Sequence, residues 1–371
     1  MKKRKIQEKI ATYIGAIIYI AAGMYVGIAA AKMMNKYDNP FVMVAVLIAF
    51  ALSMFIGIII HEGGHLVFGL LSGYKFLSFR VGNIILIKKK GKFCLKKFSI
   101  AGTGGQCLLS PPDMVDGKIP YVLYNFGGAI MNIFSALVFY LIYIFTKPGI
   151  VSEIMLIFVA ISIAMALTNG IPLKNEQIAN DGYNAISLGR DNASLRAFWL
   201  QLKVNSELAN DVMLKNMPKE WFRLPSDEEM KNSMIAVEGV FYCNYLMANC
   251  EFEKAEQTIK SLLSKDTAIV GVHKGVLRCD LIYCMIIRGA QKTEIDNLLT
   301  EEQRKFMKAM ETNPSVIRTW YAYNKCVLED DNKADKTIKE FEKVAKTYPY
   351  PADTDNERIL LKLIDERYIM Q

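Results

Sequence analysis

The sequence is poor in side chains that bind transition metals. Its 371 residues include 3 histidines (His61, His65 and His273) and 7 cysteines. An odd number of cysteines, with no Cys-x-x-Cys pair, argues against a disulfide framework and against a thiolate zinc site. We therefore expect reduced cysteines that face the cytosol.

Charge is missing from long stretches of the first half of the chain. No charged residue occurs in residues 10–31, 119–145 or 154–171, and residues 41–71 contain a single carboxylate, Glu62. About 20 apolar residues cross the hydrocarbon core of a bilayer as a helix, so four membrane spans are predicted. The first run also resembles a cleaved signal peptide, but its length and the lack of a clear cleavage site favour a retained span.

The basic residues lie mainly beside these apolar runs. The formal net charge is +8, with clusters in residues 2–5 and 75–97, whereas the other two connections between spans carry few charges. Such clusters contact anionic lipid headgroups and remain on the cytosolic side. The pattern predicts a multi-pass protein of the cell membrane with both termini in the cytosol, and it argues against a nucleic-acid partner.

Two of the three histidines share one short motif. Residues 61–65 read HEGGH. A spacing of four residues is just over one helical turn, so His61 and His65 lie on one helix face and can share a metal ion. Glu62 lies beside them, placed to take a proton from water activated by the metal. Ionisable groups within a span are costly and usually mark function, whereas the lone His273 is expected to have no catalytic role.

Two histidines leave zinc short of a third protein ligand. The second and fourth spans run in the same direction, so their distal ends lie at similar depth. Just beyond the fourth span, residues 169–172 read NGIP and residues 180–182 read NDG. Asp181 is the candidate third ligand and Glu176 the alternative. Asn180 and Asn184 are candidate supporting groups.

This combination resembles the site-2 protease family of intramembrane zinc metalloproteases, peptidase family M50. The family has HExxH on one span and Asn-x-x-Pro followed by Asp-Gly on a later one, and the resemblance covers residues 41–185. It implies that His61, His65 and Asp181 bind Zn²⁺ and that Glu62 is the catalytic base.

Asparagines and glycines in the third and fourth spans extend the resemblance. Asn125, Gly127, Gly128 and Asn132 are similar to the family's segment near the active site. The amides of Asn132 and Asn169 are candidates for binding the substrate backbone or the oxyanion. The alternative is structural, since glycines allow close helix packing and asparagine bonds across helices.

Between the second and third spans the pattern changes to that of strands. Residues 74–81, 83–89 and 92–100 are rich in β-branched and aromatic residues, with turn signals at Gly82 and Gly91. We expect two or three short strands that form a hairpin at the membrane surface. Site-2 proteases carry a β element here, and an exposed strand edge could hold an unwound substrate by β-augmentation. The alternative is a basic hairpin that rests on lipid, with residues 102–105 and 111–112 as connecting turns.

The second half of the chain has the periodicity of amphipathic soluble helices. The candidates are residues 232–248, 251–264, 271–288, 300–310, 315–328 and 333–347. Residues 245–255 resemble the inner turn of a tetratricopeptide repeat, with a weaker echo in residues 320–344, which predicts stacked helix pairs. The expected fold is mainly α: a transmembrane zinc-metalloprotease domain (1–189), followed by a cytosolic helical-repeat domain (190–371) whose concave face could bind a protein partner.

These features predict a zinc endopeptidase that hydrolyses membrane-spanning segments or hydrophobic peptides near the cytosolic side of the bilayer. The alternative is an inactive, membrane-anchored helical-repeat scaffold that binds partner proteins, against which the intact Glu62 argues. A metal transporter is disfavoured because the spans lack further histidines or acidic residues for a metal pathway.

Overall fold

The computed structural model describes residues 2–39, 41–89, 91–98, 103–174 and 179–369. The chain is mainly helical and contains a small antiparallel β-sheet. It divides into two compact units, residues 1–86 with 99–195 and residues 87–98 with 196–371. The domain boundary predicted between residues 189 and 190 stays a proposal.

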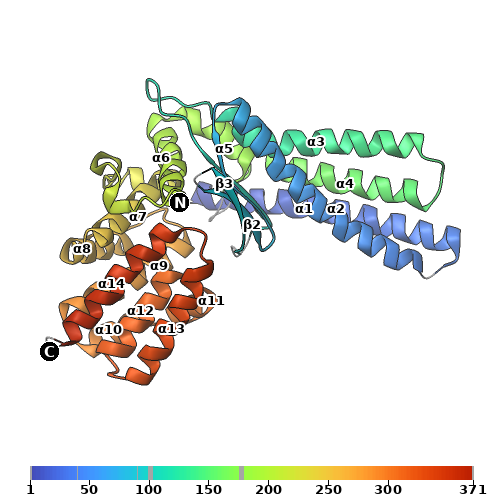
Figure 1. Cartoon of the computed structure of the whole chain (residues 1–371). Helices are drawn as coiled ribbons and strands as arrows, with labels where there is room; N and C mark the ends of the chain where they lie inside the picture. Colours follow the sequence, from blue (N-terminus) through green and yellow to red (C-terminus); the bar gives the residue numbers. More distant parts are fainter. Residues whose placement is uncertain (1, 40, 90, 99–102, 175–178, 370–371) are drawn as a thin grey trace. The chain divides into compact units, whose positions relative to one another are not determined.

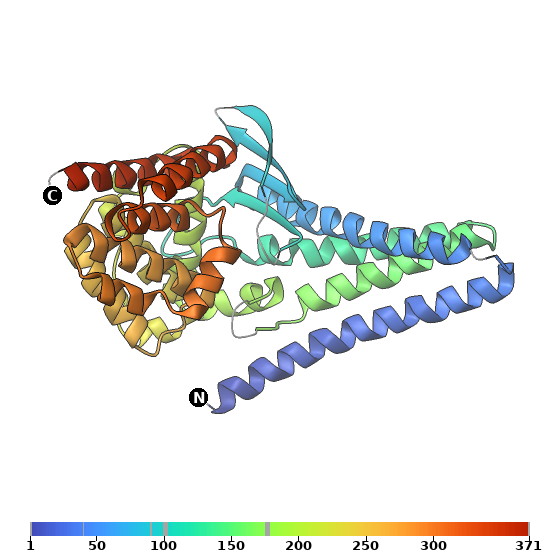
Figure 2. The same ribbon diagram turned by 90° about the horizontal axis from the view of Figure 1, so that it is seen from below.

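Four long helices dominate the first unit. They are α1 (Lys2–Tyr37), α2 (Phe41–Leu71), α3 (Val122–Phe145) and α4 (Ile150–Gly170). All four are long and apolar enough to cross a membrane, and they run alongside one another (Figure 1; Figure 2). The third begins at Val122 rather than at residue 119, because Pro120 lacks an N–H and restricts the residue before it to extended conformations.

The surface of this helix bundle is apolar where a soluble protein would be polar. Leu47, Ile133 and Phe145 are 61%, 62% and 85% exposed, among many similar side chains on the four helices. Exposed apolar surface on this scale is normally covered, and the length and apolar surface of the four helices fit contact with the hydrocarbon core of a bilayer. Inside the bundle, Met33 of α1 and Ile157 of α4 are buried in one cluster with residues of α2.

Helices α2 and α3 approach each other through glycines. A Cβ atom at Gly64 would overlap the carbonyl oxygen of Gly127, and a Cβ at Gly127 would lie 2.6 Å from the carbonyl oxygen of Gly64. This contact is the close packing that small residues permit between membrane helices. The structural role considered for Gly127 is therefore seen directly.

The β-sheet has four strands rather than two or three. They are β1 (Lys75–Val81), β2 (Ile84–Lys89), β3 (Lys92–Lys97) and β4 (Gly105–Ser110), in the order β3-β2-β1-β4. Strand β4 pairs antiparallel with β1, with Cys107 opposite Phe79. The alternative for this region placed a connecting turn at residues 102–105, which is wrong at Gly105, where β4 begins. Residues 99 and 100, placed in a strand by the sequence, lie outside the described residues.

The second unit is built of packed helices. It contains most of α6 (Asn192–Ala209), together with α7 (Ser233–Ala248), α8 (Phe252–Ser264), α9 (Gly271–Arg288), α10 (Lys292–Leu298), α11 (Glu301–Ala309), α12 (Pro314–Cys326), α13 (Asp331–Thr347) and α14 (Pro351–Ile369). Six of these were predicted, and α6, α10 and α14 were not. The two repeat-like stretches fall on the pairs α7–α8 and α12–α13, but likeness to tetratricopeptide repeats stays a proposal.

Basic residues of the β2–β3 hairpin bind protein groups in the second unit. Lys89 Nζ lies 2.8 Å from Asp211 Oδ1, and Lys96 Nζ donates a 2.7 Å hydrogen bond to the Tyr348 carbonyl. Phe98 packs edge-on against the Tyr348 ring, with the ring centroids 5.6 Å apart. Part of the basic segment expected at lipid headgroups therefore contacts protein instead.

The glycine contact between α2 and α3 can be tested within the motif itself. Gly64→Ala should destabilise the protein by about 1–3 kcal/mol, because the added methyl forces the two backbones apart. Gly63→Ala is the matched control, since a Cβ there meets no atom within 4 Å. Thermal unfolding in detergent, followed by circular dichroism, measures both. Equal melting temperatures for the two variants would contradict the packing argument.

Candidate metal centre

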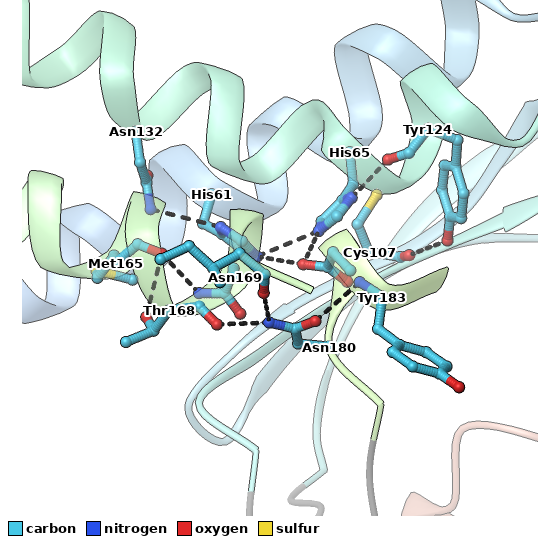
Figure 3. A network of polar contacts seen from close by, with 12 residues as sticks. His61, His65, Cys107, Tyr124, Asn132, Met165, Thr168, Asn169, Asn180 and Tyr183 are labelled. Carbon is cyan, nitrogen blue, oxygen red and sulfur yellow. Dashed lines mark hydrogen bonds and ion pairs between the residues drawn. The ribbon is translucent and has the colours of Figure 1, made fainter. Parts of the chain in front are cut away.

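Three potential metal ligands converge between α2 and α5 (Asp181–Ser187). The Nε2 atoms of His61 and His65 lie 3.2 Å apart. The Oδ2 atom of Asp181 lies 3.1 Å from Nε2 of His61 and 3.3 Å from Nε2 of His65. Figure 3 shows the two imidazoles facing this shared point. A carboxylate 120 residues away in sequence thus completes the pair on the helix.

These spacings suit a zinc ion. With bonds of about 2.0–2.1 Å in tetrahedral geometry, zinc places its ligand atoms about 3.3 Å apart. The three measured separations of 3.1, 3.2 and 3.3 Å fall close to that value. Two imidazoles and one carboxylate are also a donor set typical of catalytic zinc, which leaves a fourth position open. The residues therefore fit zinc in both chemistry and spacing.

Asn180 anchors Asp181 to the end of α4. Its Oδ1 caps α5 by accepting from the backbone N–H of Tyr183 (2.9 Å), and it also accepts from that of Leu173 (3.0 Å). Its Nδ2 donates to the carbonyls of Thr168 (2.7 Å) and Ile171 (2.6 Å) (Figure 3). One side chain thereby holds the segment before Asp181 through four hydrogen bonds. No side-chain hydrogen bond is made by Asn184 in the described part of the chain.

The partners of the imidazoles determine which nitrogen is free for metal. Nδ1 of His65 lies 2.8 Å from the Tyr124 carbonyl, which can only accept, so Nδ1 carries the hydrogen and Nε2 keeps its lone pair. The amide of Asn132, which is fully buried, lies 3.4 Å from Nδ1 of His61. The structure places the amide nitrogen, Nδ2, toward Nδ1 of His61. Because the two ends of an amide are nearly equal in shape, the flipped amide, with its oxygen toward Nδ1, would select the same tautomer as in His65.

Asp181 is suited to hold a cation. Burial raises the pKa of its carboxyl group, but hydrogen bonds from the Nε2–H groups of protonated His61 and His65, whose Nε2 hydrogens a bound metal would replace, and the charges of these imidazoles outweigh burial and hold that pKa well below its usual range. The group is therefore ionised at neutral pH. An ionised carboxylate between two imidazoles attracts a divalent cation.

Strand β4 lies against Glu62. The backbone N–H of Cys107 donates to the Glu62 carboxylate, and a Cβ at Gly105 would lie 2.6 Å from its Cγ. Because β4 is the last strand in the sheet order, one of its edges pairs with β1, and the other pairs with no strand among the described residues, although the Cys107 carbonyl accepts from the Tyr124 hydroxyl (3.4 Å). An edge without a strand partner in the described structure thus runs beside the residue proposed as catalytic base.

Arg80 holds the start of β4 in place. Its side chain is 0% exposed and donates to the carbonyls of Gly82 (2.7 Å) and Gly105 (3.1 Å), with Thr103 Oγ1 as a further partner. The sequence suggested a surface residue in a lipid-facing basic cluster. That expectation is wrong for Arg80, because backbone carbonyls satisfy its guanidinium in the interior.

Three other residues that the sequence analysis discussed are Asn169, Glu176 and His273. Asn169 donates through Nδ2 to the Met165 carbonyl (2.9 Å) of its own helix, so part of its amide is already bonded. Glu176 lies outside the described residues. His273 lies on α9 in the second unit and is not part of the ligand group. Sequence reasoning missed the Tyr124 carbonyl and the Cys107 N–H, since backbone groups leave no signature in residue type.

Comparison with known proteins identifies the family of the chain. The model of peptidase family M50 matches residues 49–319. This match covers most of the chain, including the histidine motif and Asp181, so the chain belongs to peptidase family M50. It is a membrane protein of a family of zinc metalloproteases. No curated protein and no solved structure gave a match.

The anchoring by Asn180 predicts a loss of metal affinity when that side chain is removed. Asn180→Ala should weaken zinc binding about 10- to 100-fold, as loss of groups that orient metal ligands commonly does. Asn184→Ala is the control from the same helix and should bind zinc as the wild type does. Competition with a chromogenic chelator measures both affinities. Unchanged affinity in Asn180→Ala would show that Asp181 is positioned without it.

Proposed function

We propose that this chain is a zinc-dependent intramembrane endopeptidase that hydrolyses peptide bonds in membrane-spanning segments or hydrophobic peptides. The observation that carries the proposal is the convergence of His61, His65 and Asp181 at zinc spacing. Glu62 stands beside them on an otherwise apolar helix. Membership of a peptidase family supports the same reaction.

The positions of the side chains suggest the catalytic role of each group. Zinc held by the three ligands would supply a Lewis acid that polarises the scissile carbonyl and acidifies water. Glu62 accepts a proton from the attacking water, whose oxygen adds to the carbonyl carbon. It then delivers this proton to the amide nitrogen as the carbon–nitrogen bond breaks.

Asn132 is proposed to bind the carbonyl oxygen of the substrate. In the structure Nδ2 of Asn132 faces His61 and Oδ1 has no hydrogen-bond partner among the described residues; flipping the amide places its oxygen on His61 and its N–H donor at this unpartnered position. A buried donor beside the ligand group can stabilise developing negative charge. Asn169 is the second candidate for the substrate backbone, through the part of its amide that its own helix leaves free.

The depth of the site supports cleavage at one side of the bilayer. From Phe41 to His61 is 20 residues, which at a rise of 1.5 Å span about 30 Å, the thickness of the hydrocarbon core. His61 would then lie near the far boundary of the core. With both termini in the cytosol, as the basic clusters favour, that boundary is the cytosolic one.

The free edge of β4 is proposed to hold the substrate. A transmembrane helix satisfies its own peptide groups, so it must unwind before water reaches a carbonyl. An unwound segment that pairs with β4 exchanges helix hydrogen bonds for sheet hydrogen bonds next to Glu62.

The inactive scaffold is the second candidate function, with the helices of the second unit binding a protein partner. The retained Glu62 and its position beside the ligand group favour the enzyme.

Two substitutions test the reaction directly. Glu62→Gln should retain zinc and lower the cleavage of a model transmembrane substrate about 10²–10⁴-fold, because a positioned acid–base group is lost. Asp181→Ala should lose both zinc and cleavage. Metal analysis and gel assays of the purified variants measure the two quantities. Wild-type protein that binds no zinc would overturn the proposal in favour of the scaffold.

The position of β4 makes a separate prediction. Gly105→Ala should reduce kcat at least about tenfold with zinc retained, because its methyl group displaces the Glu62 carboxylate. Gly104→Ala is the neighbouring control, where a Cβ would meet only the flexible end of Ile58, 2.9 Å away. Equal activity in the two variants would argue against contact between β4 and the catalytic base.

A further inference from the structure

The second unit encloses a cavity that the proposed peptidase chemistry does not use. Its volume is about 250 Å³, somewhat below the range of about 300–1,000 Å³ typical of ligand sites. Its walls come from α6, α7, α9, α12 and α14. A space of this size admits a side chain with its flanking backbone, not a folded partner.

The charges around the cavity do not balance. Asp280, Asp353 and Glu357 face it with Arg318 as the only basic residue of its lining. Arg318 is 1% exposed; its Nη2 lies 2.6 Å from Asp280 Oδ1 and its Nη1 lies 3.1 Å from Glu357 Oε2. One guanidinium thus serves two carboxylates and leaves the third without a counter-charge.

Asp353 is that third carboxylate. Within the part of the chain that the structure describes, it has no hydrogen-bond or ion-pair partner for its side chain. Burial and the negative charge of Glu357 raise its pKa to about 7. Glu357 is only 7% exposed, and its Oε2 accepts no hydrogen bond despite the nearby guanidinium. Two carboxylates at the cavity therefore have unused capacity to accept hydrogen bonds from a cation.

The rest of the lining suits a peptide. The amides of Asn205, Asn244 and Asn356 line the cavity and have no hydrogen-bond partner among the described residues. Each amide carries both a donor and an acceptor, the same pair that a peptide group offers. Apolar side chains such as Phe241 and Val276 lie between them. An aliphatic stem with a terminal ammonium matches this mixture of apolar walls and unpaired carboxylates.

We propose that this cavity binds an extended polypeptide segment through one lysine side chain, whose ammonium group is held by Asp353 and Glu357. The asparagine amides bind the flanking backbone. This inference rests on the proposed function, because the lysine-bearing segment is taken to be part of the peptidase's membrane substrate. Segments that flank membrane spans on the cytosolic side are rich in lysine and arginine, so the tail of a membrane substrate carries the required group.

The first test is peptide binding by the full-length protein in detergent. The Glu62→Gln background prevents cleavage. The probe is a fluorescent Ala-Ala-Lys-Ala-Ala peptide with both ends blocked, compared by anisotropy with the same peptide carrying glutamine in place of lysine. We expect saturable binding of the lysine peptide only. Absence of saturation below about 1 mM would overturn the inference. Displacement by the diamine cadaverine as effective as by unlabelled peptide would also overturn it, since the site would then recognise a small amine.

The second test separates ligand binding from a structural role of Asp353. Asp353→Asn should weaken peptide binding at least tenfold, whereas Asp355→Asn, on the same helix but paired with Arg358, should not. All three tryptophans lie in the second unit, so their fluorescence reports its unfolding in the full-length protein. We expect Asp353→Asn to raise Tm by about 1–3 °C, because it removes an uncompensated charge. A lower Tm with unchanged binding would show that Asp353 only stabilises the start of α14, and would overturn the inference.

The two proposals fail in different ways. If the peptidase assignment is wrong, zinc or cleavage is absent while lysine-peptide binding persists. If the cavity assignment is wrong, zinc and cleavage persist while Asp353→Asn and Asp355→Asn bind the peptide equally. In the active chain, cleavage of a substrate with a lysine-bearing tail should show a raised KM and an unchanged kcat in Asp353→Asn.

Discussion

Ionisable groups within an apolar helix cost free energy, and the structure around α2 is organised to offset that cost. Each such group on the helix meets a partner from another element. Asp181 of α5 faces both imidazoles, the Tyr124 carbonyl and the Asn132 amide of α3 hold their outer nitrogens, and the Cys107 N–H of β4 bonds to Glu62. These partners must converge on one helix, so the packing of α3, β4 and α5 against α2 follows from the same requirement.

The close approach of these elements to α2 depends on glycines at the helix contact and on the four hydrogen bonds of one asparagine side chain. Gly64 and Gly127 bring the backbones of α2 and α3 into direct contact, which places Tyr124 and Asn132 within reach of the histidines. On the other side, Asn180 ties the end of α4 to the start of α5. Neither the glycine contact nor the Asn180 side chain provides a metal ligand, yet the spacing of the ligands depends on both.

The second unit also buries ionisable groups, but there one carboxylate is left without a counter-charge from the protein. Arg318 is buried between Asp280 and Glu357, and its charge offsets theirs, as buried carboxylates require. Asp353 has no such partner. A buried carboxylate without a counter-charge lowers the stability of the folded protein. Binding of a cationic ligand beside it offsets this cost and stabilises the fold. In α2 the counter-charges are internal to the protein; at Asp353 we infer that the counter-charge belongs to a ligand.

Local pattern in the sequence was enough for most of the helices, for three strands and for the candidate ligands. The uncharged runs locate four long helices, and the four-residue spacing in HEGGH places both histidines on one face. The aromatic and β-branched stretches locate three strands. Asp181 followed from its place after the fourth span, and resemblance to the site-2 protease family pointed to the same residue. Except for Asp181, these signals lie within a window of about twenty residues.

Only the tertiary structure decided which distant groups meet. Strand β4, with the sequence GQCLLS, has weak local preference and exists through its pairing with β1, about 30 residues earlier. Arg80 has a residue type typical of surfaces, but it is buried, and one of the carbonyls that bind its guanidinium, that of Gly105, lies 25 residues away in sequence. The cavity of the second unit draws its walls from five helices. Contacts between remote segments depend on the geometry of the folded chain, which composition and periodicity do not encode locally. Helix signals do not share this limit, because helix hydrogen bonds join residues four apart. Strand signals share it in part, because the alternation of side chains is local but the hydrogen bonds join different strands.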